Sequence, residues 1–125
     1  MKLLIDTHAL VWWLSDSRRL SSSARSAITD AHNDLFVSAC VAYEIRYKQR
    51  SGRLPPIADH LSRELHRQGI AVVAITLEHA LGAAALPGPH RDPWDRLMIA
   101  QALAEQCQVV TVDPVFAGYG VPVLW

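Results

Sequence analysis

The sequence contains few of the features that mark several large classes of protein. Only two of its 125 residues are cysteines, Cys40 and Cys107, and neither has a CxxC partner or a histidine at metal-ligand spacing. A disulfide scaffold is therefore excluded, and two buried free thiols in a reducing compartment are expected. No apolar run approaches the ~20 residues that a membrane-spanning helix needs. We expect a protein without a membrane segment, located in the cytoplasm.

An excess of charge of one sign is also missing. The chain has 12 lysines and arginines against 12 aspartates and glutamates, so its formal net charge is zero. Taken at face value, this balance argues against a basic nucleic-acid binder and against an acidic tail.

The residues that are present predict an α/β protein. Half of them are hydrophobic, enough for one domain with its own core. Short, continuous apolar runs alternate with helical patterns, which indicates a central, mainly parallel twisted sheet of four to five strands, flanked by helices on both faces. The expected strands are 3–5, 35–37, 70–75, 109–112 and 121–124. The expected helices are 9–14, 24–31, 41–50, 57–68, 77–86 and 93–106.

Four acidic residues lie within or directly against apolar runs. Asp6 and Asp113 follow two of the predicted strands, and ligand sites of open α/β sheets lie outside such strand ends. Asp95 begins an apolar stripe along its helix. Glu44 shares a helix face with apolar positions and with Lys48. These positions make the four acids candidates for a common site.

Each acid also has an ordinary structural explanation. Asp6 can cap the first helix, and Asp113 can begin a turn. Glu44 can form a surface ion pair with Lys48. A place in the first turn of a helix explains the charge of Asp95 but not its position on the apolar face.

If the four carboxylates converge, a divalent cation is needed to offset their mutual repulsion. Ligands that are all oxygen suit Mg²⁺ or Mn²⁺. Such ions activate water and stabilise charge on a phosphate, so the residues point to phosphoryl transfer or phosphodiester cleavage.

An aspartyl phosphatase is disfavoured because His8 stands where a second aspartate is expected. A histidine-based nuclease is a further alternative, with His8 or His90 as acid and base.

Five motifs carry a resemblance to a known family. They are LLIDTH at 3–8, VAYEI at 41–45, HRDPWDRLMIAQA at 90–102, VTVDPVF at 110–116 and YGV at 119–121. In this order, and over nearly the whole chain, the sequence resembles the PIN-domain ribonucleases, specifically the VapC-like toxins of type II toxin–antitoxin pairs. The resemblance implies a single PIN domain over residues 1–125 with the PIN-like fold.

The resemblance implies a metal-dependent endoribonuclease that acts as the toxin of such a pair. Metal-activated water would hydrolyse RNA phosphodiester bonds and leave 5′-phosphate and 3′-hydroxyl ends. The expected partners are RNA, a VapB-like antitoxin that places an arginine against the acids, and a second copy of the chain. The residues that would bind Mg²⁺ or Mn²⁺ and carry catalysis are Asp6, Glu44, Asp95 and Asp113.

Auxiliary roles are expected for four further residues. Thr111 matches a small polar residue that the family places beside the last acid, and Thr7 offers a second hydroxyl. Asp92 either caps its helix or helps to hold metal-bound water. Arg96 is expected to orient a carboxylate or a phosphate.

A basic run follows Glu44 along the chain. Arg46, Lys48, Arg50 and Arg53 form either a solvated helix face or a rim that contacts RNA phosphates, and the first three are the candidate RNA contacts. If the four acids share one pocket, 12 basic residues stand against eight acidic ones elsewhere. The neutral total then does not exclude an RNA partner.

Two alternatives to a ribonuclease toxin remain for the function of the whole chain. They are a non-catalytic PIN-like module that binds RNA or protein, and another magnesium-dependent phosphotransfer enzyme.

Overall fold

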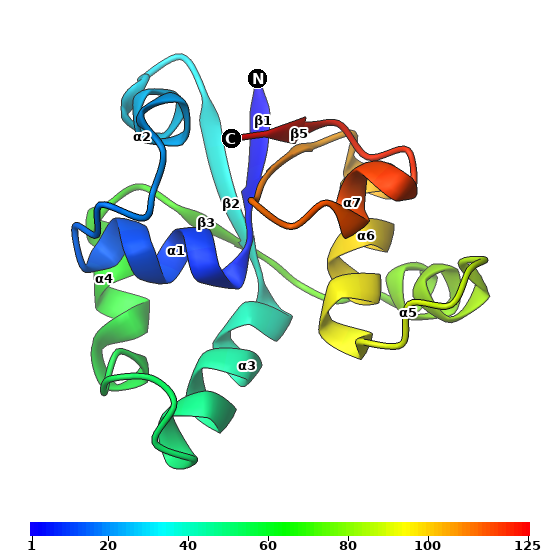
Figure 1. Cartoon of the computed structure of the whole chain (residues 1–125), viewed down its shortest axis with the longest axis horizontal. Coiled ribbons are helices and arrows are strands. Elements are labelled where there is room, and N and C mark those ends of the chain that lie inside the picture. Colours follow the sequence, from blue (N-terminus) through cyan, green and yellow to red (C-terminus); the bar gives the residue numbers. More distant parts are fainter.

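The centre of the molecule is a sheet of five parallel strands. A computed structural model describes all 125 residues and orders the strands β3-β2-β1-β4-β5, each parallel to its neighbours (Figure 1). The predicted α/β fold with a parallel sheet is therefore confirmed. The strand bounds are β1 Lys2–Ile5, β2 Asp34–Ser38, β3 Ala71–Val73, β4 Gln108–Val110 and β5 Val123–Leu124.

Helices cover both faces of this sheet. Figure 1 shows α1, α2 and α4 on one side of the strands and α5, α6 and α7 on the other. Helix α3 lies beyond the end of β2 and packs against both α1 and α6. The helix bounds are α1 Thr7–Leu14, α2 Ser22–Thr29, α3 Ala39–Arg50, α4 Leu61–Arg67, α5 Leu77–Ala85, α6 Pro93–Glu105 and α7 Val115–Gly118. No helix is both long and apolar enough to span a bilayer.

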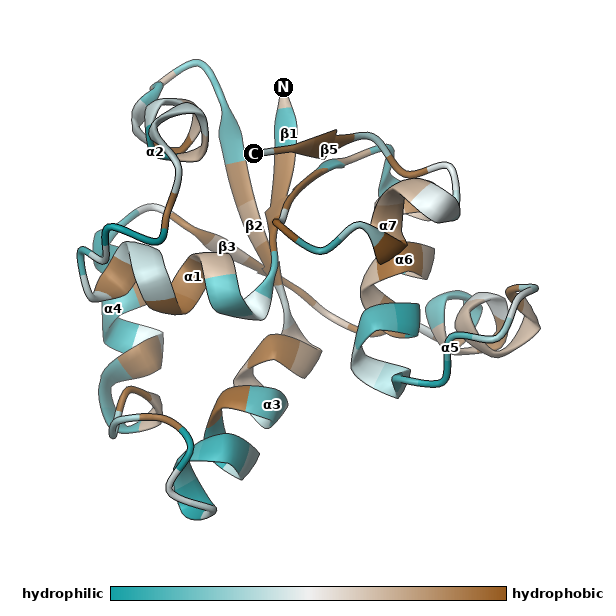
Figure 2. Ribbon diagram, in the orientation of Figure 1, coloured by the Kyte–Doolittle hydropathy of each residue, from teal (hydrophilic) through white to brown (hydrophobic).

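The core follows from the composition of the central strands. Leu3, Leu4 and Ile5 of β1 are almost completely buried, as are Val109 and Val110 of β4. Strands covered on both faces need such continuous apolar runs. Figure 2 shows the same pattern, with hydrophobic residues along the central strands and hydrophilic ones along the far half of α3. Both cysteines are buried and free, as predicted.

One predicted helix is divided in the structure. Residues 57–68 were expected to form a single helix, but a 3-10 turn over Ala58–His60 precedes α4. His60 has φ −122° and ψ 8°, outside the helical region, which interrupts the α-helix. The predicted end of the helix is confirmed, because Gly69 adopts a φ of +70° directly after it.

Three predicted strands are shorter than expected. The expected ranges 70–75, 109–112 and 121–124 become Ala71–Val73, Gln108–Val110 and Val123–Leu124. Strands β3 and β5 form the edges of the sheet, so each pairs on one side only and is supported by fewer backbone bonds. The chain after β4 instead turns away from the sheet toward α7.

The order of the strands places a topological switch point at the carboxyl ends of β1 and β4. The chain moves outward from β1 through β2 to β3, then crosses back to β4 on the other side of β1. Ile5 is paired with Val110, so the residues that follow both strands are neighbours. Ligand sites of open α/β sheets lie at this kind of switch point.

Candidate functional site

Asp6 lies at the end of β1 and caps α1. Its Oδ1 accepts a 2.7 Å hydrogen bond from the Ala9 amide, and its Oδ2 accepts one from the Thr111 hydroxyl. The side chain is buried, and this burial raises the pKa of Asp6. The bonds from Thr111 and Ala9 oppose the rise, while the neighbouring charge of Glu44 adds to it. The capping role is therefore present, and both carboxylate oxygens have protein partners.

Glu44 projects from α3 and is also bonded at both oxygens. The Thr7 hydroxyl donates to Oε1 at 2.5 Å, and Lys48 Nζ donates to Oε2 at 2.5 Å. The predicted ion pair with Lys48 exists, but it is not on the surface. The Lys48 side chain is only 18% exposed and that of Glu44 only 8%. A buried pair with a second hydrogen bond holds the carboxylate in one orientation.

Asp95 lies in the first turn of α6. Its Oδ2 is 2.9 Å from His90 Nε2. Burial raises the pKa of Asp95 to about 6, and the charges of Asp92 and Asp113 add to the rise. The bond from His90 acts in the opposite direction. Asp92 caps the helix through amide bonds from Trp94 and Asp95 itself, which agrees with the capping alternative.

Asp113 is the third residue after the end of β4. Its amide donates to the Thr111 hydroxyl oxygen at 3.0 Å, and its Oδ1 accepts from the Val115 amide at 3.0 Å. The same hydroxyl donates to Asp6, so Thr111 links the acids that follow β1 and β4. Asp113 thus has the predicted turn geometry and one carboxylate oxygen without a hydrogen-bond partner in the chain.

Thr111 joins Asp6 to the Asp113 amide, and the charges of neighbouring acids also act on one another. Glu44 acts on Asp6, and Asp113 acts on Asp95. The buried thiol of Cys40 reports on both groups, because burial raises its pKa to about 11 and the charges of Glu44 and Asp95 add to the rise. Like charges that interact in this way favour a counter-cation.

The donor set fits a hard divalent cation in kind. All four acids offer oxygen ligands, which Mg²⁺ and Mn²⁺ prefer. As arranged, however, no three acidic, histidine or cysteine side chains lie close enough together to hold one ion. Their oxygens instead accept bonds from Thr111, Thr7, Lys48 and His90. Of these donors, only Lys48 carries a fixed positive charge.

The expectation that Arg96 orients a carboxylate or phosphate is wrong for this structure. Its guanidinium donates instead to backbone carbonyls of Ala83, Ala84, Leu86 and His90. Arg96 therefore ties the loop between α5 and α6 to the helix that carries Asp95. A planar group with five donors is suited to fastening a loop in this way.

The predicted basic rim does not form one patch. Arg46 turns toward the segment before α4, where it pairs with Asp59 at 3.0 Å. Lys48 is engaged by Glu44, and Arg50 is exposed at the end of α3. Positions two residues apart on a helix point in different directions, which explains the separation.

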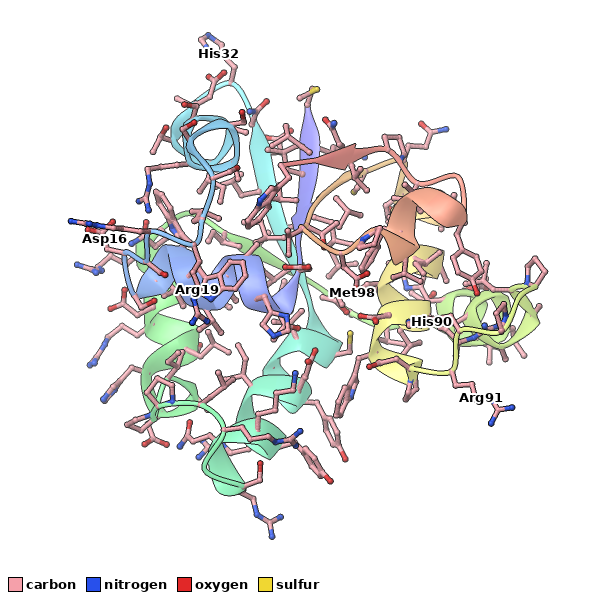
Figure 3. The ribbon with its side chains drawn as sticks, in the orientation of Figure 1. Asp16, Arg19, His32, His90, Arg91 and Met98 are labelled. Carbon is pink, nitrogen blue, oxygen red and sulfur yellow. The ribbon has the colours of Figure 1, made fainter.

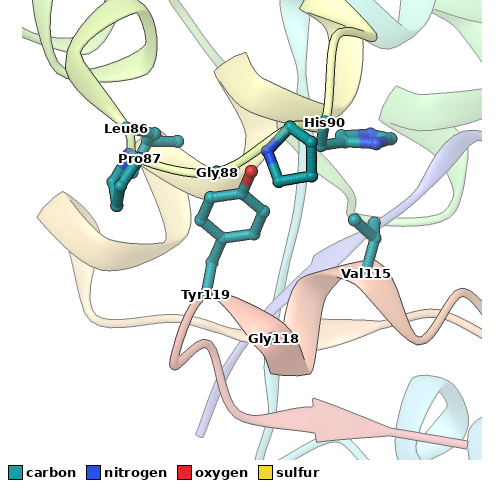
Figure 4. Close-up of a pocket in the computed structure, with 8 residues that line it drawn as sticks. Leu86, Pro87, Gly88, His90, Val115, Gly118 and Tyr119 are labelled. Carbon is teal, nitrogen blue, oxygen red and sulfur yellow. The ribbon is translucent and has the colours of Figure 1, made fainter.

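The contact of His90 with Asp95 was not predicted from the sequence. In Figure 3, His90 turns toward the body of the molecule, whereas the next residue, Arg91, extends into solvent. His90 also lines an open hollow of about 740 Å³ between the loop after α5 and α7. Figure 4 shows Tyr119 and Val115 on the opposite wall of this hollow. The only signal in the sequence was the place of His90 at the head of the motif that contains Asp95.

Comparison with known proteins now assigns the family. The family model described as the PIN domain matches residues 3–121. The chain belongs to the PIN-domain family. It is also 32% identical over 115 residues to ribonuclease VapC22 of Mycobacterium tuberculosis, an alignment that covers 89% of this chain and 86% of that protein. The resemblance to VapC-like PIN domains is thereby confirmed.

Solved structures show the same PIN-domain fold. A VapBC2 structure from Rickettsia felis, bound to a DNA fragment from its promoter, has a TM-score of 0.72 at 16% identity and covers 98% of this chain and 97% of that one. FitAcB from Neisseria gonorrhoeae has a TM-score of 0.68 at 18% identity and covers 97% and 95%. At this identity the likeness concerns the fold.

Proposed function

We propose that this PIN domain, over residues 1–125, is a divalent-metal-dependent endoribonuclease and the toxin of a VapBC-type pair. The observation that carries the proposal is the 32% identity to a ribonuclease over most of both chains. The acids at the carboxyl edge of the sheet add the chemistry that such a reaction needs.

The residues that would hold Mg²⁺ or Mn²⁺ are Asp6, Glu44, Asp95 and Asp113. A divalent ion bound there would supply positive charge against the phosphate and make water easier to deprotonate. The chain itself orients the ligands. Thr111 fixes the orientation of Asp6, and Thr7 fixes that of Glu44. His90 Nε2 orients Asp95 and can exchange a proton with its Oδ2.

A VapB-like antitoxin is the proposed protein partner. The structures that share this fold include VapBC2 and FitAcB. A cluster of partly desolvated carboxylates attracts a guanidinium, which can bind them in a bidentate manner. An arginine of the antitoxin would therefore compete with metal and RNA for the same acids. An RNA substrate, an antitoxin partner and two free thiols suit a cytoplasmic location.

A second copy of the chain is proposed to cover an apolar surface on β3 and α5. Four large hydrophobic side chains there are between 40% and 71% exposed: Val72, Ile75, Leu77 and Leu81. Exposed apolar side chains favour association when they gather into one surface. Because β3 is an edge strand, the same surface also gives a partner access to unpaired backbone groups.

The function can be tested on purified protein with total cellular RNA. We expect cleavage that stops in EDTA, returns with Mg²⁺ or Mn²⁺, and leaves 5′-phosphate ends that can be mapped by ligation. Asp6→Asn is the inactive control. Undiminished cleavage in EDTA would favour the histidine mechanism, and loss of RNA cleavage under all metal conditions would favour a non-catalytic binding module. Expression should arrest growth unless the neighbouring antitoxin gene is expressed.

A further inference from the structure

Three aromatic side chains contact one another beside the candidate site. Tyr43 and Tyr47 are four residues apart on α3, so they share a face of the helix. Their rings are stacked, with centroids 6.3 Å apart and planes inclined by 14°. Trp94, at the start of α6, contacts both rings at centroid distances of 5.9 and 5.7 Å. We call these three residues the aromatic cluster.

Trp94 packs against the core, but the two tyrosines of the aromatic cluster lie outside it. Tyr43 is 62% exposed and Tyr47 is 49% exposed, whereas Phe116 of the core is 1% exposed. Aromatic surface in contact with water is unfavourable, so adjacent exposed rings indicate a surface that is covered when a partner binds. The packing of Trp94 against both tyrosines keeps the rings in place before that partner arrives.

The aromatic cluster borders the acids. Tyr43 directly precedes Glu44, and Trp94 directly precedes Asp95. Successive residues of a helix point about 100° apart. The row of tyrosine rings on α3 therefore runs beside the row formed by Glu44 and Lys48. A ligand long enough to cover both rows would extend from the rings to the acids.

A cation lies at the far end of the cluster. The guanidinium of Arg53 is centred 5.6 Å from the ring of Tyr47, and its Nε donates to the Ser51 hydroxyl. Arg53 pairs with no carboxylate, in contrast to Arg46, which pairs with Asp59. Its charge is therefore available to an anion beside the rings.

From these contacts we infer that the aromatic cluster is a stacking platform for unpaired bases of single-stranded RNA next to the scissile phosphate. Arg53 binds a backbone phosphate at the far end of this platform. Base faces stack on aromatic side chains in many proteins that bind single-stranded RNA, and the arrangement tolerates any base. The cation of Arg53, which pairs with no carboxylate, favours the polyanionic RNA over a protein segment as occupant. The inference rests on the proposed ribonuclease function and specifies the form of its substrate.

Binding of a short fluorescent RNA in Mg²⁺, measured by anisotropy, tests the platform. The Asp6→Asn chain serves as background so that the RNA stays intact. Combined Tyr43→Leu and Tyr47→Leu substitutions keep apolar surface but remove the stacking faces. We expect single-stranded RNA to bind about tenfold more weakly or worse, and a perfect duplex of the same sequence to be unaffected. Phenylalanine at both positions should restore binding to within about twofold.

Two further variants separate stacking from charge and from general surface effects. Arg53→Gln should reduce the dependence of log K on log salt by about 0.7, the contribution of one phosphate of a single strand, and Arg53→Lys should retain it. Leu103→Ala removes an exposed apolar side chain elsewhere, 44% exposed on α6, and should leave RNA binding unchanged.

Several results would overturn the inference. Suppose that wild-type protein cleaves RNA, but the variant with both leucines binds single-stranded RNA as tightly as the Asp6→Asn protein does. In that case the platform is wrong and the ribonuclease function stands. If that variant instead loses affinity only for the antitoxin, the cluster is a protein-docking surface. If wild-type protein neither binds nor cleaves RNA, both the function and the platform fail.

Discussion

The acids of this PIN domain form an inner pair and an outer pair that are held differently. Both oxygens of Asp6 and both oxygens of Glu44 are bonded within the chain. Asp95 and Asp113 each use one oxygen only, in bonds with His90 and the Val115 amide. The inner pair is thus coupled to the fold, whereas the outer pair retains free coordination capacity.

This difference separates carboxylates that are fully bonded within the chain from carboxylates with an oxygen left free. Buried carboxylates need donors, and the inner pair obtains them from Thr111, Thr7 and Lys48. The outer pair is less completely bonded, and burial raises the pKa of Asp95 to about 6. The carboxylate oxygens without a partner in the chain therefore belong to Asp95 and Asp113.

The largest expected effect is loss of cleavage when either pair loses a carboxylate. Under the proposed function, Asp6→Asn and Asp95→Asn should each lower kcat/KM by on the order of 10³-fold, because each would remove a charged ligand of the metal that acts on the phosphate. Asparagine is an efficient N-cap, so Asp6→Asn should remain folded. Asp16→Asn, on an exposed loop, is the matched control and should retain full activity. Normal cleavage by either site variant would show that the site is misassigned.

The next effect concerns the pH dependence of stability at Asp95, a member of the outer pair. Because burial raises the pKa of Asp95 from 3.8 to about 6, the folded chain holds a proton that the unfolded chain releases. The contribution of Asp95 to the free energy of unfolding therefore falls as pH rises through this window, by up to roughly 3 kcal/mol. Urea titrations of metal-free wild-type protein and Asp95→Asn should differ most at neutral pH, with the variant the more stable. Equal stability at pH 7 would contradict the raised pKa.

A smaller effect on stability is expected from loss of Lys48, the cation that pairs with Glu44. Lys48→Met leaves the buried Glu44 carboxylate without its partner, which should destabilise the metal-free protein by roughly 1–3 kcal/mol. Saturating Mg²⁺ should restore most of this loss, because the ion replaces the missing charge. Thermal unfolding with and without Mg²⁺ measures both values. An identical Mg²⁺ shift in the variant and the wild type would place Glu44 outside the metal site.

The smallest effect should come from the hydroxyls that orient the inner pair. Thr111→Val should lower kcat about tenfold, because it releases Asp6 and the Asp113 amide together. Thr7→Val should have a weaker effect, since Lys48 still holds Glu44. Serine at either position keeps the hydroxyl and should restore activity. A Thr7→Val loss greater than that of Thr111→Val would reverse the assigned importance of the two contacts.

Much of the fold was predictable because its signals are local. The continuous apolar runs around Leu4 and Val109 indicate strands buried on both faces, and the Asp92–Pro93 pair marks the start of α6. The break before α4 was not predictable from periodicity, because it depends on the backbone at His60. The shortening of β3 depends on its place at the sheet edge, which sequence spacing does not reveal.

For the site, the sequence by itself selected the acids, since charged residues against apolar runs need a reason. It did not decide between capping and function, and the structure shows why: Asp6 and Asp92 have capping bonds as well as places near the other acids. Only the tertiary structure separated Arg96 and Arg46 from the acids and brought His90 to Asp95. Residue type and the spacing of apolar residues can be read from the sequence. The direction of a long side chain depends on its neighbours in the folded structure, so the sequence alone does not give it.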